Sequence, residues 1–204
     1  MRTTILSTGD AAAIPTALEV LKAGGLVAFP TDTVYGLASD LFNPDAIDRI
    51  YAAKDRDMSK AVAVLLATIE QLEQVAQGIS PQASKLAARF WPGALTLVLA
   101  RKAGLPANLS ALPTIGVRMP DHSFARRLLT AAGPLATTSA NRSGMADATR
   151  TEQVLAQLEG RVDLVLDGGE SPGGVPSTVV DCTGADVRIL RQGAIPAEEI
   201  FKLF

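Results

Sequence analysis

Side chains that could bind an anionic ligand follow several apolar runs of this chain. The run 26–29 ends at Pro30, and Thr33 follows it in the segment TDTVYG. Arg118 and Arg191 each end a further apolar run, in IGVRMP and RILRQG. Arginine binds carboxylates and phosphates through paired N–H donors, and hydroxyls can bind the same oxygens. Taken alone, each of these residues also fits a strand that ends in a turn or in solvent.

A second group consists of the cations Lys54 and Arg56. Lys54 follows Ile47, Ile50 and Tyr51 at helical spacing, so it continues the apolar face of a predicted helix at its C-terminal end. Two cations at the edge of a core suit an anion such as a phosphate. From spacing alone, a lysine and an arginine that extend their charged ends to solvent are the favoured interpretation.

A third group lies in ATTSANRSG, residues 136–144. A predicted strand runs into Thr137 and Ser139, and Asn141 follows. Hydroxyl, amide and backbone N–H groups at the carboxyl end of a strand are typical of ligand sites in open α/β sheets. A polar turn fits this composition equally well.

The direction of the preceding strands decides whether Thr33, Arg118, Ser139 and Arg191 form one site. If those strands point the same way, their ends converge on one edge of the sheet. Such a site has few general bases, because the one histidine, His122 in MPDHSF, is expected to lie at the surface or to cap a helix. The chain lacks a Walker motif, a dinucleotide-binding glycine motif and a Ser/His/Asp set. These features suit binding of phosphates and carboxylates while a substrate's own nucleophile attacks.

The elements that must position these residues alternate along the chain. Strands are predicted at Leu26–Pro30, Ala61–Leu66, Leu95–Arg101, Ile115–Arg118, Leu135–Ser139, Asp163–Asp167, Thr178–Cys182 and Val187–Leu190. Helices are predicted from start signals at Asn43, Thr68, Ser80, Ser123 and Thr151, with stops that include Gly78, Pro92, Gly133 and Gly160.

This alternation predicts an α/β protein with a mixed or largely parallel sheet. We expect one domain over residues 1–204. The long loops Ala103–Thr114 and Gly168–Ser177 are rich in glycine and proline, which is common in functional loops.

The composition predicts a soluble, cytoplasmic protein. Of the 204 residues, 48% are hydrophobic and the net charge is −2, which disfavours a dedicated nucleic-acid binder. The single cysteine, Cys182, is expected to be a small buried hydrophobe, and no spacing indicates a zinc site. No signal peptide or membrane-spanning run is recognisable, so no membrane partner is expected.

Several motifs together resemble the YrdC-like threonylcarbamoyl-AMP synthases. They are FPTDTVYGLASD, the pair Lys54 and Arg56, WPGALTLVL, IGVRMPDH, TSAN, PSTVVDCT and ILRQGAI, in that order over about residues 10 to 195. The resemblance implies a twisted mixed α/β sheet with helices on both faces and an open cleft. It is to the short form of the family, without the extra C-terminal domain.

The resemblance also implies an activity. These enzymes join L-threonine, bicarbonate and ATP into L-threonylcarbamoyladenylate and release pyrophosphate, with Mg²⁺ expected on the ATP phosphates. A threonylcarbamoyl transferase complex then modifies adenosine 37 of tRNAs that read codons starting with A. A weak direct tRNA contact is compatible with that pathway.

Matching positions carry the implied roles. The residues implied to bind L-threonine are Thr33, Arg118, Thr137 and Ser177. Those implied to bind the nucleotide are Lys54, Arg56, Thr114, Ser139, Asn141 and Arg191, with Lys54 and Arg56 assigned as catalytic because they would hold the ATP phosphates. One departure is Leu65, which falls where many relatives have a histidine that faces the threonine.

Two other functions compete with this one. An RNA-binding module would fit the pathway, although the acidic net charge and the lack of basic stripes with aromatic residues argue against it. The second alternative is a relative of the same fold that acts on another carbamoyl adenylate. The presence of Ser139 and Asn141 speaks against it. Asp32 has no assigned role; orienting a neighbour or the loop backbone is the expectation.

Overall fold

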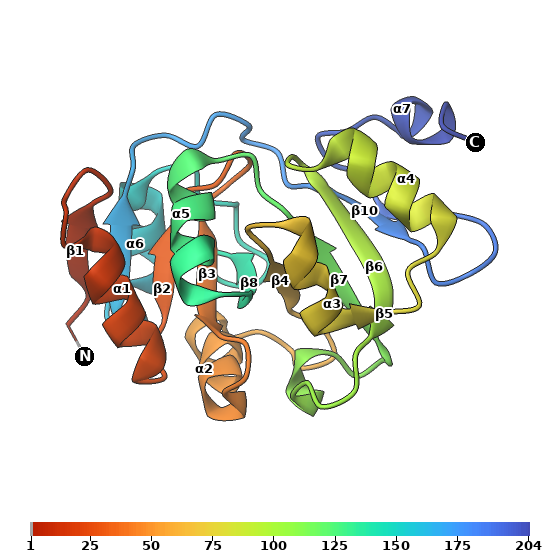
Figure 1. Cartoon of the computed structure of the whole chain (residues 1–204). Coiled ribbons are helices and arrows are strands. Elements are labelled where there is room, and N and C mark those ends of the chain that lie inside the picture. The colour runs from red at the N-terminus through yellow and green to blue at the C-terminus, as the bar shows by residue number, and fades with distance from the viewer. Residues whose placement is uncertain (1) are drawn as a thin grey trace.

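The computed structural model describes residues 2–204 as an α/β arrangement of strands and helices (Figure 1). The strands are β1 (Thr4–Ser7), β2 (Val27–Phe29), β3 (Gly36–Asp40), β4 (Ala63–Leu65), β5 (Ala76–Gln77), β6 (Leu95–Arg101), β7 (Thr114–Arg118), β8 (Leu135–Ser139), β9 (Leu164–Asp167), β10 (Thr178–Asp181) and β11 (Arg188–Arg191). The helices are α1 (Ala13–Lys22), α2 (Pro44–Lys54), α3 (Leu72–Val75), α4 (Pro81–Phe90), α5 (Ser123–Ala132), α6 (Thr151–Leu158) and α7 (Ala197–Phe201), with short 3₁₀ turns η1 (Ile69–Gln71) and η2 (Ala107–Leu109).

The strands form one mixed sheet. Its order is β1-β9-β2-β3-β8-β4-β7-β6-β10-β11, with β5 paired to β6. The pairs β1/β9, β2/β9, β4/β7 and β6/β10 are parallel. The remaining pairs are antiparallel. The prediction of a mixed sheet is therefore confirmed, and a largely parallel sheet is not what forms.

The four strands that carry the candidate residues do not all point the same way. β2 and β8 are both antiparallel to β3, so they share one direction. β4 is antiparallel to β8 and parallel to β7, which gives β7 the opposite direction. β11 shares the direction of β7, through β6 and β10. The condition for convergence of the four strand ends on one edge, a common strand direction, is therefore not met.

Helices cover both faces of the β2–β3 part of the sheet (Figure 1). Buried residues of α1 and α5 pack with Ala38, Leu65 and Leu135, which lie on one face. Leu37 and Ala136 alternate to the other face and join the larger hydrophobic cluster, which includes buried residues of α2 and α6. In the β6–β7 part, α3 and α4 contribute to that same cluster together with the leucines of β6.

Capping residues begin three helices as the sequence signals indicate. The Asn43 side chain accepts a hydrogen bond from the backbone N–H of Ala46 at 3.2 Å, and Ser80 does so from Ala83 at 3.1 Å. His122 caps α5 by accepting from the N–H of Ala125 at 3.3 Å, which confirms its expected capping role.

Other local predictions are wrong or incomplete. The helix expected from Thr68 to Gly78 breaks up into η1 and α3, because the chain becomes strand β5 at Ala76 and pairs with β6. Strands β1 and β3 and helices α1 and α7 were not predicted. Cys182 is buried, as expected, and burial raises the pKa of its thiol to about 11. Within residues 2–204, none of the helices combines the length and apolar character needed to cross a membrane.

Candidate active site

A cavity of about 390 Å³ lies on one face of the sheet, between β3 and β11. Seven of the candidate residues line it: Thr33, Arg56, Arg118, Thr137, Ser139, Ser177 and Arg191. Neither His122 nor Cys182 is among the lining residues. The cavity therefore brings together residues that are far apart in the sequence and that the sequence motifs had singled out.

Strand register explains why oppositely directed strands share this cavity. Thr137 lies beside Ala63 across the β8–β4 pair, and Arg118 lies beside Leu65 across the β4–β7 pair. Since alternate residues of a strand point to the same face, these neighbours all reach one side of the sheet. The site is thus built on a sheet face, which needs no common strand direction.

Two glycines form part of the cavity wall. A Cβ atom at Gly116 would lie 3.2 Å from Cγ2 of Thr96, and one at Gly36 would lie 3.1 Å from Cγ2 of Thr137. A glycine inside a strand often marks close approach of a ligand to the backbone. These two positions keep space above the sheet that any side chain would reduce.

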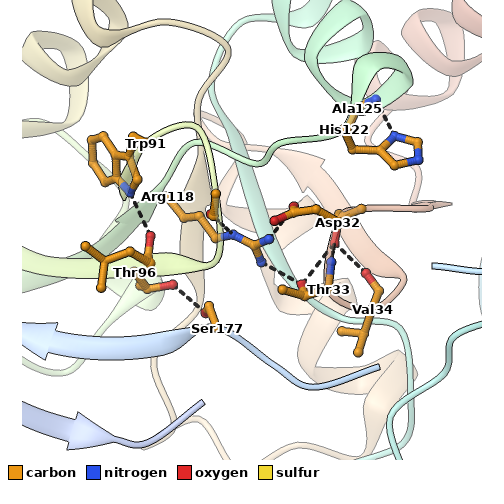
Figure 2. A network of polar contacts seen from close by, with 12 residues as sticks. Asp32, Thr33, Val34, Trp91, Thr96, Arg118, His122, Ala125 and Ser177 are labelled. Carbon is orange, nitrogen blue, oxygen red and sulfur yellow. Dashed lines mark hydrogen bonds and ion pairs between the residues drawn. The ribbon is translucent and has the colours of Figure 1, made fainter. Parts of the chain in front are cut away.

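Arg118 is the centre of a buried polar network (Figure 2). Its Nε donates a hydrogen bond to the carbonyl of Gly93 at 2.9 Å, and Nη1 donates to Oγ1 of Thr33 at 2.8 Å. Nη2 forms an ion pair with Asp32. Burial lowers the pKa of Arg118, while the charge of Asp32 raises it. The guanidinium stays charged at neutral pH, since arginine is effectively always protonated in proteins.

The loop that carries Thr33 is fixed by its own hydroxyls. Oγ1 of Thr31 donates to the carbonyl of Val34 at 2.6 Å and accepts from the N–H of Thr33 at 3.2 Å. Both threonines are buried. This threonine turn presents the Thr33 hydroxyl to the cavity beside Arg118.

The opposite side of the cavity is formed by β10 and β11. The hydroxyls of Ser177 and Thr96 are hydrogen-bonded at 2.7 Å. Nη2 of Arg191 donates to the carbonyl of Ser177 at 2.8 Å. Arg191 is exposed, so this cation lies at the rim of the cavity rather than at its base.

Lys54 is buried beneath the segment that carries Ser139 and Asn141. Its Nζ donates to the backbone carbonyls of both residues, and only 1% of the residue is exposed. Burial, followed by the nearby charge of Arg56, lowers the pKa of Lys54 to about 7. Lys54 does not line the cavity, whereas Arg56 does. The role of Lys54 in holding phosphates stays a prediction.

The remaining two candidate residues lie next to the cavity rather than in its wall. Asn141 is buried and its amide donates to the carbonyl of Met145 at 2.7 Å, which closes the turn after β8. Thr114 begins β7 and shares a face with the lining residues Gly116 and Arg118. Contact of Thr114 or Asn141 with a nucleotide also stays a prediction.

Sequence reasoning missed Asp147, the one carboxylate that lines the cavity. It follows the 136–144 segment in a stretch without secondary structure, and no sequence signal distinguishes it from a surface aspartate. The described residues that line the cavity also include three arginines, Arg56, Arg118 and Arg191. Burial, and to a lesser degree the nearby charge of Arg191, lowers the pKa of both Arg56 and Arg118. This excess of positive charge suits a ligand with several negative charges.

A model of one protein family matches residues 19–193 of the chain; it covers Sua5, YciO and YrdC and is described as "Telomere recombination". The chain belongs to the Sua5/YciO/YrdC family. Two curated family members, from Pyrococcus abyssi and Bacillus subtilis, are each 42% identical to it and are named threonylcarbamoyl-AMP synthase. The matches cover 90% and 96% of this chain, but 54% and 57% of those proteins. The chain thus spans little more than half the length of these relatives.

A solved family structure has the same fold. Pyrococcus abyssi Sua5 complexed with L-threonine is 41% identical to the chain and superposes with a TM-score of 0.90. The match covers 93% of this chain and 56% of that one. The twisted α/β fold implied by the motif resemblance is therefore confirmed.

Proposed function

We propose that this chain is a threonylcarbamoyl-AMP synthase, which joins L-threonine, bicarbonate and ATP and releases pyrophosphate. The observation that carries the proposal is the cavity itself, where Arg56, Arg118 and Arg191 converge with threonine and serine hydroxyls. Support comes from the two family members with this name and from the complex of Pyrococcus abyssi Sua5 with L-threonine.

The amino acid binds around Arg118. Its carboxylate takes the N–H groups that Arg118 directs to the cavity, and the hydroxyls of Thr33, Thr137 and Ser177 surround it. Charge-assisted hydrogen bonds from arginine to a carboxylate are among the strongest that proteins form.

The nucleotide binds along the part of the cavity lined by Arg56, Ser139 and Arg191. Arg56 and Arg191 neutralise the phosphates, and Lys54 supports this region from below. Thr114 and Asn141 complete the nucleotide contacts at its margin.

The reaction needs no protein nucleophile. The amine of threonine adds to bicarbonate, and loss of water gives a carbamate. A carbamate oxygen then attacks the α-phosphorus of ATP, the bond to the β-phosphate oxygen breaks, and pyrophosphate leaves. The protein's contribution is to hold two anions together and to balance their charge, and orientation of this kind can lower a barrier by about 7–11 kcal/mol in favourable cases.

Mg²⁺ fits this site as a partner of the phosphates. It is usually held by one or two carboxylates together with substrate phosphates, and Asp147 is a carboxylate in the cavity wall. When bound, the ion would neutralise the charge of the leaving pyrophosphate. Asp147 would hold it.

In the cell, the adenylate would pass to a threonylcarbamoyl transferase that modifies adenosine 37 of tRNA. A cytoplasmic location and a weak tRNA contact belong to the same proposal.

Pyrophosphate release tests this function. Release should require ATP, L-threonine and bicarbonate together, and chelation of divalent ions should abolish it. Arg118→Ala should mainly raise the L-threonine requirement, and Lys54→Ala should mainly weaken ATP use. Arg126→Ala, an exposed arginine outside the cavity, is the matched control. Release that is independent of L-threonine would reject the proposal, and tight, salt-sensitive tRNA binding in its place would favour an RNA-binding module.

A further inference from the structure

The network around Arg118 contains one residue without a role in the proposed function, Asp32. It forms the ion pair with Arg118, and the two side chains are 13% and 8% exposed, respectively. Arg118 and Thr33 line the cavity, whereas Asp32 does not. Asp32 therefore contacts the guanidinium without being one of the residues that line the cavity, and Figure 2 shows its side chain beside that of Arg118.

The hydrogen bonds of Arg118 leave it capacity for a ligand. A guanidinium has five N–H groups. Gly93, Thr33 and Asp32 accept from one each of Nε, Nη1 and Nη2. One further N–H on Nη1 and one on Nη2 are therefore left, and two neighbouring N–H groups are what a carboxylate needs for a paired contact.

Charge balance gives Asp32 a second effect. Arg118 is buried in a cavity that already contains Arg56 and Arg191, and burying a charge without a partner is strongly unfavourable. Asp32 is the described carboxylate that forms an ion pair with Arg118. Its negative charge stabilises the buried guanidinium, and its side chain takes up no space in the cavity.

The backbone of Asp32 is itself held in place. A Cβ atom at Gly173 would lie 2.5 Å from the carbonyl oxygen of Asp32, so only glycine allows the 168–177 loop to pass this closely. The N–H of Gly174 donates to the carbonyl of Thr33 at 2.8 Å. The 168–177 loop therefore packs against the backbone of Asp32 and is hydrogen-bonded to the next residue, Thr33.

We propose that Asp32 is a positioning residue that orients the Arg118 guanidinium for the carboxylate of the amino-acid substrate. This inference rests on the proposed function, because it assigns the amino acid to Arg118. Asp32 acts through Arg118 and makes no contact with substrate.

Calorimetric titration of the full chain with L-threonine and, separately, with ATP tests this role in Asp32→Asn. Asparagine keeps the shape and one acceptor oxygen, so the fold should persist. We expect L-threonine affinity to fall at least tenfold and ATP affinity to change less than twofold. Asp181→Asn is the matched control, since Asp181 is a buried aspartate that pairs with Arg188 outside the cavity, and it should leave both affinities unchanged.

A competing ligand separates positioning from direct contact. 3-Hydroxybutanoate keeps the carboxylate of threonine and lacks its amine, and its affinity should fall by the same factor in Asp32→Asn. A loss confined to L-threonine would show that Asp32 binds the amine and would overturn the proposal. Unchanged L-threonine affinity in a folded variant would also overturn it, whereas a wild-type chain that binds no L-threonine would reject the proposed function as well.

Nitrogen-15 NMR of arginine side chains gives a test that needs no activity, and its first comparison is made within the wild-type chain. In the wild-type chain, the Hε proton of Arg118 should exchange with solvent at least tenfold more slowly than that of exposed Arg150. In Asp32→Asn, the Arg118 exchange should accelerate. Arg118→Lys assigns the signal by its loss. Equal exchange of the two arginines in the wild type would contradict a fixed guanidinium.

Discussion

The two halves of the sheet are built from the same strand pattern and differ in what covers one face. Around β2, β9 and the Ala38 end of β3, α1 and α5 cover one face, whereas Gly36 at the other end of β3 lines the cavity. Around β4, β6 and β7, the same face carries Thr96, Gly116 and Arg118 and opens into the cavity. On the opposite face, Leu37, Ala136 and Leu97 belong to one hydrophobic cluster that extends across both halves. The first half is therefore packed against apolar side chains on both faces of the sheet, and the second half on one face only.

This difference shows where a mutation should act. In the covered half, side chains serve burial, and their loss should lower the free energy of unfolding without changing the site. In the open half, the residues on the cavity face carry polar contacts, and their loss should change ligand binding more than stability.

The largest effect on stability is expected from Leu164→Ala in β9. Leu164 is fully buried in the covered half, and truncating a buried leucine typically costs about 2–5 kcal/mol. Urea denaturation should show this loss, while the Michaelis constants of the folded enzyme stay unchanged. Leu112→Ala, at a leucine that is 64% exposed, is the control and should change neither. Altered Michaelis constants in Leu164→Ala would mean that the halves are coupled.

A large effect on binding is expected from Arg118→Met in the open half. Hydrogen bonds to charged groups contribute about 1.5–3 kcal/mol each, so losing the carboxylate contact should raise the Michaelis constant for L-threonine about 100-fold. The constant for ATP should change less than about threefold. Steady-state pyrophosphate release at varied concentrations of each substrate measures both.

The control for this variant is Arg150→Met, which removes an exposed arginine outside the cavity. It should leave both constants at the wild-type values. Equal losses for L-threonine and ATP in Arg118→Met would place the two substrates at one shared contact and contradict the assignment.

The sequence predicts most of the strands of the fold and misses those that depend on pairing. The eight predicted strands all form, and several of them are continuous apolar runs, which signal burial in the sheet. β3 was missed because its run is short and follows a loop of polar residues, and it becomes a strand through pairing with β2 and β8. β5 was missed because its two residues pair only once β6 is in place.

The sequence predicted most residues of the site but not their arrangement in space. Seven candidate residues line the cavity, since motifs preserve residue types and their order. Strand direction depends on tertiary pairing, so the sequence left open whether these strands end at one edge of the sheet, and in the structure they do not. Asp147 and the space above Gly116 have no local signature, because both depend on which strands become neighbours.

A pH-dependent effect is expected from Lys54, whose pKa falls to about 7 on burial against about 10.4 in an unfolded chain. Between these values the unfolded state binds one more proton than the folded state, so stability rises with pH. The slope contributed by Lys54 is at most about 1.4 kcal/mol per pH unit.

Urea denaturation at pH 7, 8 and 9 should show this rise in the wild type, and Lys54→Met should remove that part of it. Lys60→Met, at an exposed lysine of the same region, should keep the wild-type slope. A slope that is identical in the wild type and in Lys54→Met would mean that Lys54 stays protonated in the folded chain, held by the carbonyls of Ser139 and Asn141.

The smallest effect is expected from Gly116→Ala in the cavity wall. The added methyl group would approach Cγ2 of Thr96 to 3.2 Å and Cβ of Ala63 to 3.6 Å, so small shifts can accommodate it and the fold should persist. It removes space beside Arg118, and we expect kcat/KM for L-threonine to fall about fivefold, or about 1 kcal/mol. Gly9→Ala, where the nearest atom would be 3.6 Å away, is the control with no cavity contact. An unchanged kcat/KM in Gly116→Ala would mean that the substrates do not reach this part of the sheet face, and the open half would then bind them only through its rim.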